Sequence, residues 1–204
     1  MKIKVLPYSK EWPNQFKALK DEISKLLSSF DPIIEHFGST AVPELSAKPV
    51  IDILVGIDNK KDFSKIVELL LQDNRYVYYQ AFEQGMPERR LFVRIKDDCV
   101  LTGIKSIQDD FDTTPHEKIS KFRVAHIHIW KFNSPDWIRH IAFRDFLVAH
   151  PIEREDYGRL KIKLSQHNWA HGMEYNDSKN KFIKEIEAKA IAWFQKENNS
   201  QFVK

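Results

Sequence analysis

Two neighbouring pieces of sequence decide the fold, Phe37-Gly38-Ser39-Thr40 and Val50-Ile51-Asp52-Ile53-Leu54-Val55. The second is a nearly continuous apolar run rich in β-branched residues, which is typical of a central strand buried on both faces. Strand side chains alternate, so Asp52 and Leu54 share one face. A lone carboxylate in such a strand is costly to bury unless it is paired, hydrogen-bonded or metal-bound. Asp52 is therefore the candidate catalytic and metal-binding residue. The alternative is an aspartate that accepts backbone hydrogen bonds or pairs with a lysine such as Lys48.

The rest of the chain predicts a series of strands and helices. Strands are expected over residues 33–37, 50–57, 75–80, 89–96 and 122–131, and helices over 10–29, 60–73, 135–150, 153–168 and 178–196. Ser134-Pro135 makes a good helix start, with an N-cap serine and a proline at N1. The polar segment 97–121 predicts no regular element. We expect an α+β fold with a helical C-terminal part.

Length and composition favour one ordinary soluble domain over residues 1–204, with the sheet core at about 33–131 and the C-terminal helices at about 135–198. A formal net charge of +3 argues against bulk nucleic-acid binding. Cys99 is the single cysteine, so no intramolecular disulfide can form. The sequence shows no signal peptide and no run of ~20 apolar residues, so we expect a cytoplasmic protein without a membrane segment. The sequence leaves the oligomeric state open.

Three further groups are candidates for binding phosphate. Gly38, Ser39 and Thr40 form a turn whose backbone N–H groups can hold an anion, although a Gly-Ser pair is more often only a turn. Lys48, just before the Asp52 strand, can meet a phosphate as a point charge or stay solvated. Arg90 can clamp a triphosphate or cover apolar surface with its stem.

His126 and His128 stand two residues apart on a predicted strand, so both imidazoles project from one face. Two such histidines are a common metal-ligand geometry. The alternative is a pair of partly buried histidines bonded to the backbone or to acidic side chains. The metal interpretation becomes sharper if Asp52 lies on the neighbouring strand and faces the same way.

Taken in order, these segments resemble the GrpB-like family of the nucleotidyltransferase superfamily. The resemblance is carried by Pro7, Tyr8, Trp12, residues 36–43 and 48–53, Arg89-Arg90-Leu91, His126-Ile127-His128, residues 143–147, His150-Pro151, Tyr157 and Leu160-Lys161. It implies an α+β fold with a nucleotidyltransferase-type mixed sheet flanked by helices, and a nucleotide or phosphorylated small molecule as partner. Similar domains are fused to dephospho-CoA kinases. Glu44 stands where the family's turn has a glycine.

Active transferases of the polymerase-β type place two carboxylates on the second strand, at i and i+2, whereas this chain has Leu54 at the second position. Two-metal chemistry relies on shared carboxylates. If His126 and His128 complete the site around Asp52, the ligand set is softer and suits Mn²⁺ or Zn²⁺ better than paired Mg²⁺.

Three functions follow from these residues. The first is a metal-dependent nucleotidyltransferase acting on a small molecule. The second is a nucleotide- or ligand-binding module on the same fold that has lost catalysis. The third is a metal-dependent phosphate-ester hydrolase built on Asp52, His126 and His128.

Overall fold

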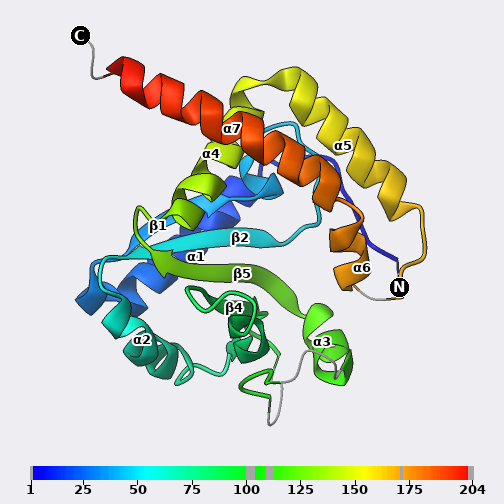
Figure 1. Cartoon of the computed structure of the whole chain (residues 1–204). Helices are drawn as coiled ribbons and strands as arrows, with labels where there is room; N and C mark the ends of the chain where they lie inside the picture. Colours follow the sequence, from blue (N-terminus) through cyan, green and yellow to red (C-terminus); the bar gives the residue numbers. More distant parts are fainter. Residues whose placement is uncertain (1, 100–103, 109–112, 171, 202–204) are drawn as a thin grey trace. The chain divides into compact units, whose positions relative to one another are not determined.

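The computed structural model describes residues 2–99, 104–108, 113–170 and 172–201 (Figure 1). The chain divides into two compact units. The sheet unit contains residues 13–36 and 50–137, and the helical unit contains residues 1–12, 37–49 and 138–204. No helix in the described part of the chain is both long and apolar enough to cross a membrane.

The sheet has five strands in the order β1-β2-β5-β4-β3. Their bounds are β1 Ile33–Phe37, β2 Ile51–Ile57, β3 Tyr76–Tyr78, β4 Arg90–Ile95 and β5 Arg123–Lys131. Strand β2 pairs in parallel with β5, whereas β4 pairs antiparallel with both β5 and β3. The sheet is therefore mixed, as the family resemblance implies. The buried centre of β2 fits its β-branched sequence, because both faces of that strand meet apolar side chains.

Cross-strand partners point to the same side of a sheet, so the register defines two faces. We call one the histidine face; its residues are Asp52, Leu54, Gly56, Leu91, Val93, Ile95, His126, His128 and Trp130. The opposite side, the helical face, is covered by α1 (Trp12–Leu26) and α2 (Phe63–Leu70). Helix α1 reaches it through Glu22, which contacts Arg94, and α2 through Phe63, which lies under Arg90.

An apolar cluster covers the β3–β4 side of the histidine face. It combines strand residues with side chains from the segment after β4, including Ile107 and Ile119. Ile119 belongs to α3 (Thr113–Ser120), a helix that the polar sequence of 97–121 did not predict. The β2–β5 side of the same face carries Asp52 and His126, which remain partly exposed.

The helical unit packs the C-terminal helices around its own core. These helices are α4 (Pro135–Ala149), α5 (Pro151–Ser165), α6 (Gly172–Asp177) and α7 (Asn180–Gln201). Phe146 and Leu147 of α4, Tyr157 of α5, and Ile186 of α7 share the core with residues of the 37–49 segment. The predicted α+β class with a helical C-terminal part is confirmed. Only the short helix α6 was not expected there.

Candidate metal centre

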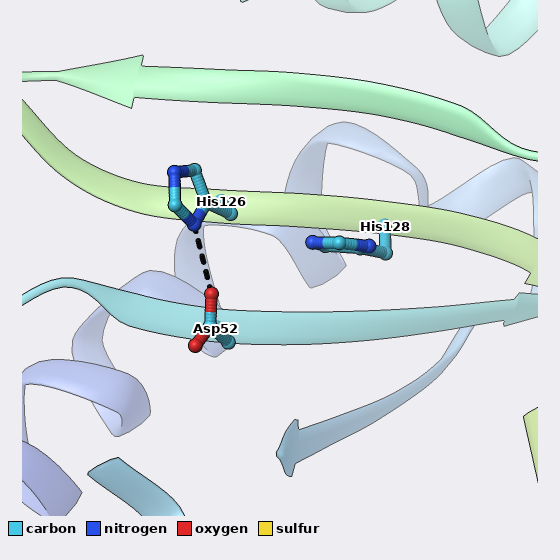
Figure 2. A group of neighbouring side chains, drawn as sticks. All are labelled: Asp52, His126 and His128. Carbon is cyan, nitrogen blue, oxygen red and sulfur yellow. Dashed lines mark hydrogen bonds and ion pairs between the residues drawn. The ribbon is translucent and has the colours of Figure 1, made fainter. Parts of the chain in front are cut away.

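Asp52 and His126 are brought together by the parallel pairing of β2 with β5, in which they are direct partners. His126 Nδ1 lies 2.8 Å from Asp52 Oδ1 (Figure 2). With the proton on Nδ1, the imidazole donates to the carboxylate and leaves Nε2 for a ligand. With Nδ1 deprotonated, both atoms offer lone pairs to a cation. Either state equips this pair for metal or proton chemistry.

His128 completes the group from two residues further along β5. Its ring points along the strand toward the other two side chains in Figure 2. One ligand atom from each of Asp52, His126 and His128 can be chosen so that all lie within 4.8 Å of one another. The donors of one tetrahedral ion with bonds of ~2.1 Å lie ~3.4 Å apart, so small side-chain rotations bring these three into range. Asp52 thus lies on the strand next to the two histidines and faces the same way, which the metal interpretation of the sequence requires.

The donor set and its exposure suit a divalent transition metal. Two imidazole nitrogens and one carboxylate oxygen match ions such as Zn²⁺ or Mn²⁺ better than Mg²⁺, which prefers oxygen ligands. The Asp52 and His126 side chains are 28% and 27% exposed, so a ligand can approach from solvent. Three protein ligands leave coordination positions open for a substrate.

Leu54 explains why the site has a single carboxylate on β2. It stands opposite His128 and shares the histidine face, but its side chain is completely buried. A carboxylate at this position would be desolvated without a solvent-facing side. Among the described residues, Asp52, His126 and His128 form the one group of three or more acidic, histidine or cysteine ligands that meets metal-site spacing. Paired carboxylates for two metals are not found there.

Arg123 also lies on this face, although the sequence analysis did not single it out. A register shift in the β4–β5 pairing makes Arg94 the partner of Ala125 but Ile95 the partner of Arg123. This β-bulge turns Arg123 toward the histidine face, where Ile95 points. Strict alternation from His126 would place Arg123 on the opposite side. The sequence pattern thus gives the wrong side for this residue, and only the bulge reveals the correct one.

Arg90 is placed away from the metal candidates. Its partner on β5 is Ile129, so it belongs to the helical face rather than the histidine face. Its guanidinium pairs with Glu83 at 3.3 Å, donates to the carbonyl of Pro87 at 2.8 Å and lies over the Phe63 ring. The structure therefore does not bring Arg90 to the Asp52 site, and phosphate binding by Arg90 stays a prediction.

Gly38, Ser39, Thr40 and Lys48 belong to the helical unit. Gly38 adopts a positive φ of 70°, which explains the glycine, and the residues after it form a single turn of 3₁₀ helix, Ser39–Ala41. Thr40 is buried. The Lys48 ammonium lies 4.3 Å from the ring centroid of Tyr175, a cation–π contact. Phosphate binding by these four residues stays a prediction.

Glu44 also has a positive φ, of 66°. This is the left-handed region that glycine enters without steric cost, which gives a physical reason for the glycine expected at this position. The Glu44 carboxylate accepts from Arg154 at 2.6 Å, so the turn keeps its shape with an ion pair inside the helical unit.

Comparison with known proteins adds a family context. The model of the family described as GrpB protein matches residues 2–189. A UPF0157 protein of Halalkalibacterium halodurans is 30% identical over 93% of this chain and 83% of its own length. The crystal structure of conserved protein GrpB from Enterococcus faecalis is 28% identical, covers 94% of this chain and 99% of that chain, and superimposes with a TM-score of 0.72.

Some relatives are about twice as long as the region they share with this chain. The UPF0157 protein YqkA of Bacillus subtilis is 26% identical over 98% of this chain, which spans 50% of that protein. A dephospho-CoA kinase of Mycobacterium bovis is 23% identical over 93% of this chain, which spans 46% of the kinase. The link to dephospho-CoA kinases suggested by the family resemblance is therefore found.

Proposed function

This chain belongs to the GrpB protein family, and we propose that its sheet unit is a metal-dependent phosphate-ester hydrolase that holds one divalent ion with Asp52, His126 and His128. The observation that carries the proposal is the convergence of the three donor atoms within 4.8 Å on a partly exposed face. The substrate class is a phosphorylated small molecule such as a nucleotide.

The chemistry follows from the donor set. A divalent ion in such a site acts as a Lewis acid toward a phosphoryl oxygen and activates water as a nucleophile. Asp52 would supply the negative charge that holds the ion, and the two imidazoles would be its other ligands. The 2.8 Å contact between Asp52 and His126 keeps the carboxylate and the imidazole ring side by side.

A single carboxylate on β2 favours hydrolysis over two-metal nucleotidyl transfer. Buried Leu54 occupies the position where a second carboxylate would bridge two ions. Nucleotidyl transfer remains the second candidate, because Gly38 precedes the turn Ser39–Ala41 with a positive φ of 70°, and glycine lets a phosphate approach the backbone closely. Names of relatives that include dephospho-CoA kinase are consistent with a phosphorylated or nucleotide-containing substrate for either reaction.

Metal binding is tested first, by calorimetric titration of metal-free protein with Zn²⁺, Mn²⁺ and Mg²⁺. We expect tight binding of Zn²⁺ or Mn²⁺ at one site per chain, and its loss in His126→Ala and in His128→Ala. His167→Ala is the matched control, because His167 is an exposed histidine of the helical unit. Equal affinity in all four proteins would overturn the proposed site.

Turnover is tested next with the metal-loaded protein. Release of phosphate from phosphate monoesters and nucleotides, and transfer of a labelled nucleotidyl group, are followed in parallel. Metal-dependent release that disappears in His128→Ala supports the hydrolase. Transfer of label to an acceptor would support the second candidate instead. Metal or nucleotide binding without either reaction would identify the chain as the binding module that has lost catalysis.

A further inference from the structure

The guanidinium of Arg123 is the charged group on the histidine face that the proposed chemistry has not used. We propose that Arg123 is the anion-binding residue of this site and that it holds a phosphate group of the substrate. The proposal rests on the proposed function for its ligand class, because a substrate at the Asp52 cluster would carry a phosphoryl group. Its geometric basis is the β-bulge that turns Arg123 to the side of Ile95 and His126.

The surroundings of Arg123 leave its charge largely uncompensated. Its Nε atom is buried and has no hydrogen-bond partner among the residues that the structure describes. Burial lowers the pKa of the guanidinium, and the nearby Tyr79 and Asp52 only partly offset this effect. A buried donor without a partner is costly, so a residue kept in this state calls for an explanation.

The interaction with Asp52 ties Arg123 to the metal candidates. The Asp52 carboxylate attracts the Arg123 guanidinium, so the two groups are near enough to interact electrostatically. Arginine offers donors in a rigid planar fork that fits two phosphate oxygens at once, which a lysine cannot do. A phosphate held by the Arg123 guanidinium would therefore lie on the same face of the sheet as Asp52 and His126.

A purely structural role for Arg123 predicts a different effect of its replacement on stability. If Arg123 served only to stabilise the sheet, replacing it would remove favourable contacts and lower stability. If it is a binding residue held ready at a cost, an apolar residue of similar length removes a desolvated charge and is neutral or stabilising. In Arg123→Met, phosphate binding should therefore weaken while the stability of the protein stays the same or increases. A purely structural role would instead lower the stability.

The experiment titrates inorganic phosphate into metal-free protein by calorimetry at constant ionic strength, with thermal unfolding measured without ligand. The variants are Arg123→Met, Arg123→Lys and the control Arg159→Met, an exposed arginine of α5 that is ion-paired with Glu155. We expect the phosphate Kd to rise at least ~10-fold in Arg123→Met, by less in Arg123→Lys, and not in the control. Without phosphate, Arg123→Met should melt at the wild-type temperature or above it.

Two results would overturn the proposal: a wild-type protein that binds no phosphate, or an Arg123→Met protein that binds it as well as wild type. Zn²⁺ titration of the same proteins separates this proposal from the hydrolase. Arg123→Met should keep or tighten metal binding, because it removes a positive charge near Asp52. A wild-type protein that binds no metal would refute the metal site but not the role of Arg123, because the phosphate titration is measured on metal-free protein.

Discussion

Asp52 and His126 lie directly opposite each other on parallel strands, with His126 Nδ1 2.8 Å from Asp52 Oδ1. This contact makes Asp52 either a ligand itself or the carboxylate that orients a histidine ligand. We expect Asp52 to be a ligand, since its oxygen is within 4.8 Å of donor atoms on both histidines. Asp52→Asn and Asp52→Ala should then both weaken Zn²⁺ binding by more than ~100-fold, beyond the loss typical of an orienting residue.

Calorimetric titration with Zn²⁺ measures this, and Asp52→Asn is the informative variant. The asparagine keeps an acceptor for His126 but removes the negative charge. An Asp52→Asn protein that stays within tenfold of wild type would show that Asp52 orients His126 and does not bind the metal.

Leu54→Asp should destabilise the sheet rather than restore a two-carboxylate site. Leu54 is completely buried, so the new carboxylate loses its hydration and a packed side chain is lost as well. We expect a loss of ~3–5 kcal/mol in the free energy of unfolding, measured with urea. Leu54→Met, which nearly conserves volume, should cost less than ~1.5 kcal/mol. A stable Leu54→Asp protein that binds Mg²⁺ tightly would contradict this explanation of the missing carboxylate.

Glu44→Gly should stabilise the helical unit. Glu44 has a φ of 66°, and glycine enters this region without the steric cost that a Cβ imposes. Its ion pair with Arg154 is a small loss, because the Glu44 side chain is 77% exposed. We expect a gain of ~1 kcal/mol, or a melting temperature ~2–4 °C higher. Glu44→Ala loses the same ion pair but keeps the strain, so it should melt no higher than wild type; equal melting of the two variants would refute the strain argument.

Gly56→Ala should weaken the packing at the end of β2. A Cβ there would lie 2.8 Å from Trp137 Cζ3 and 2.9 Å from Phe132 Cδ2, two rings that also contact each other with centroids 5.3 Å apart. Overpacking of this kind costs ~1–3 kcal/mol. Gly85→Ala is the control, because a Cβ at Gly85 meets nothing within 4 Å. Urea unfolding of both variants measures the difference, and a Gly56→Ala protein as stable as the control would be inconsistent with the close ring contacts.

Acid should remove stability that comes from carboxylates paired with Arg75 and Arg94. The pKa of Asp73 is lowered from its ordinary value of 3.8, chiefly by hydrogen bonds from Arg75, which lies 2.6 Å away. A lowered native pKa contributes stability that is complete above 3.8 and is lost as the pH falls through the native value.

Asp73→Asn should therefore reduce the unfolding free energy at pH 7 and flatten its decline below pH ~4. Denaturant unfolding over that pH range measures both effects. Asp58→Asn replaces an exposed aspartate and should leave the curve unchanged. A decline as steep in Asp73→Asn as in wild type would mean that other groups dominate the acid response.

Much of the fold follows from local pattern. The β-branched run of β2, the strand of His126 and His128 and the C-terminal helices were all predictable, because period-2 and period-3.6 hydrophobicity are properties of short segments. Alternation alone also places both histidines on one face. The helix α3 was missed because its sequence is polar and has a weak apolar stripe, so only its packing through Ile119 reveals why it forms.

The composition of the candidate site depends on tertiary structure. Asp52 and His126 are 74 residues apart in sequence, and the register between β2 and β5 brings them together. Pairing with β4 places Arg90 on the helical face, and one bulge in the same pairing turns Arg123 to the histidine face. The sequence by itself determined which residues share a strand face. Only the tertiary structure decided which residues of neighbouring strands lie side by side, through long-range backbone hydrogen bonds. The register matters because a shift of one residue moves every side chain of a strand to the other side of the sheet.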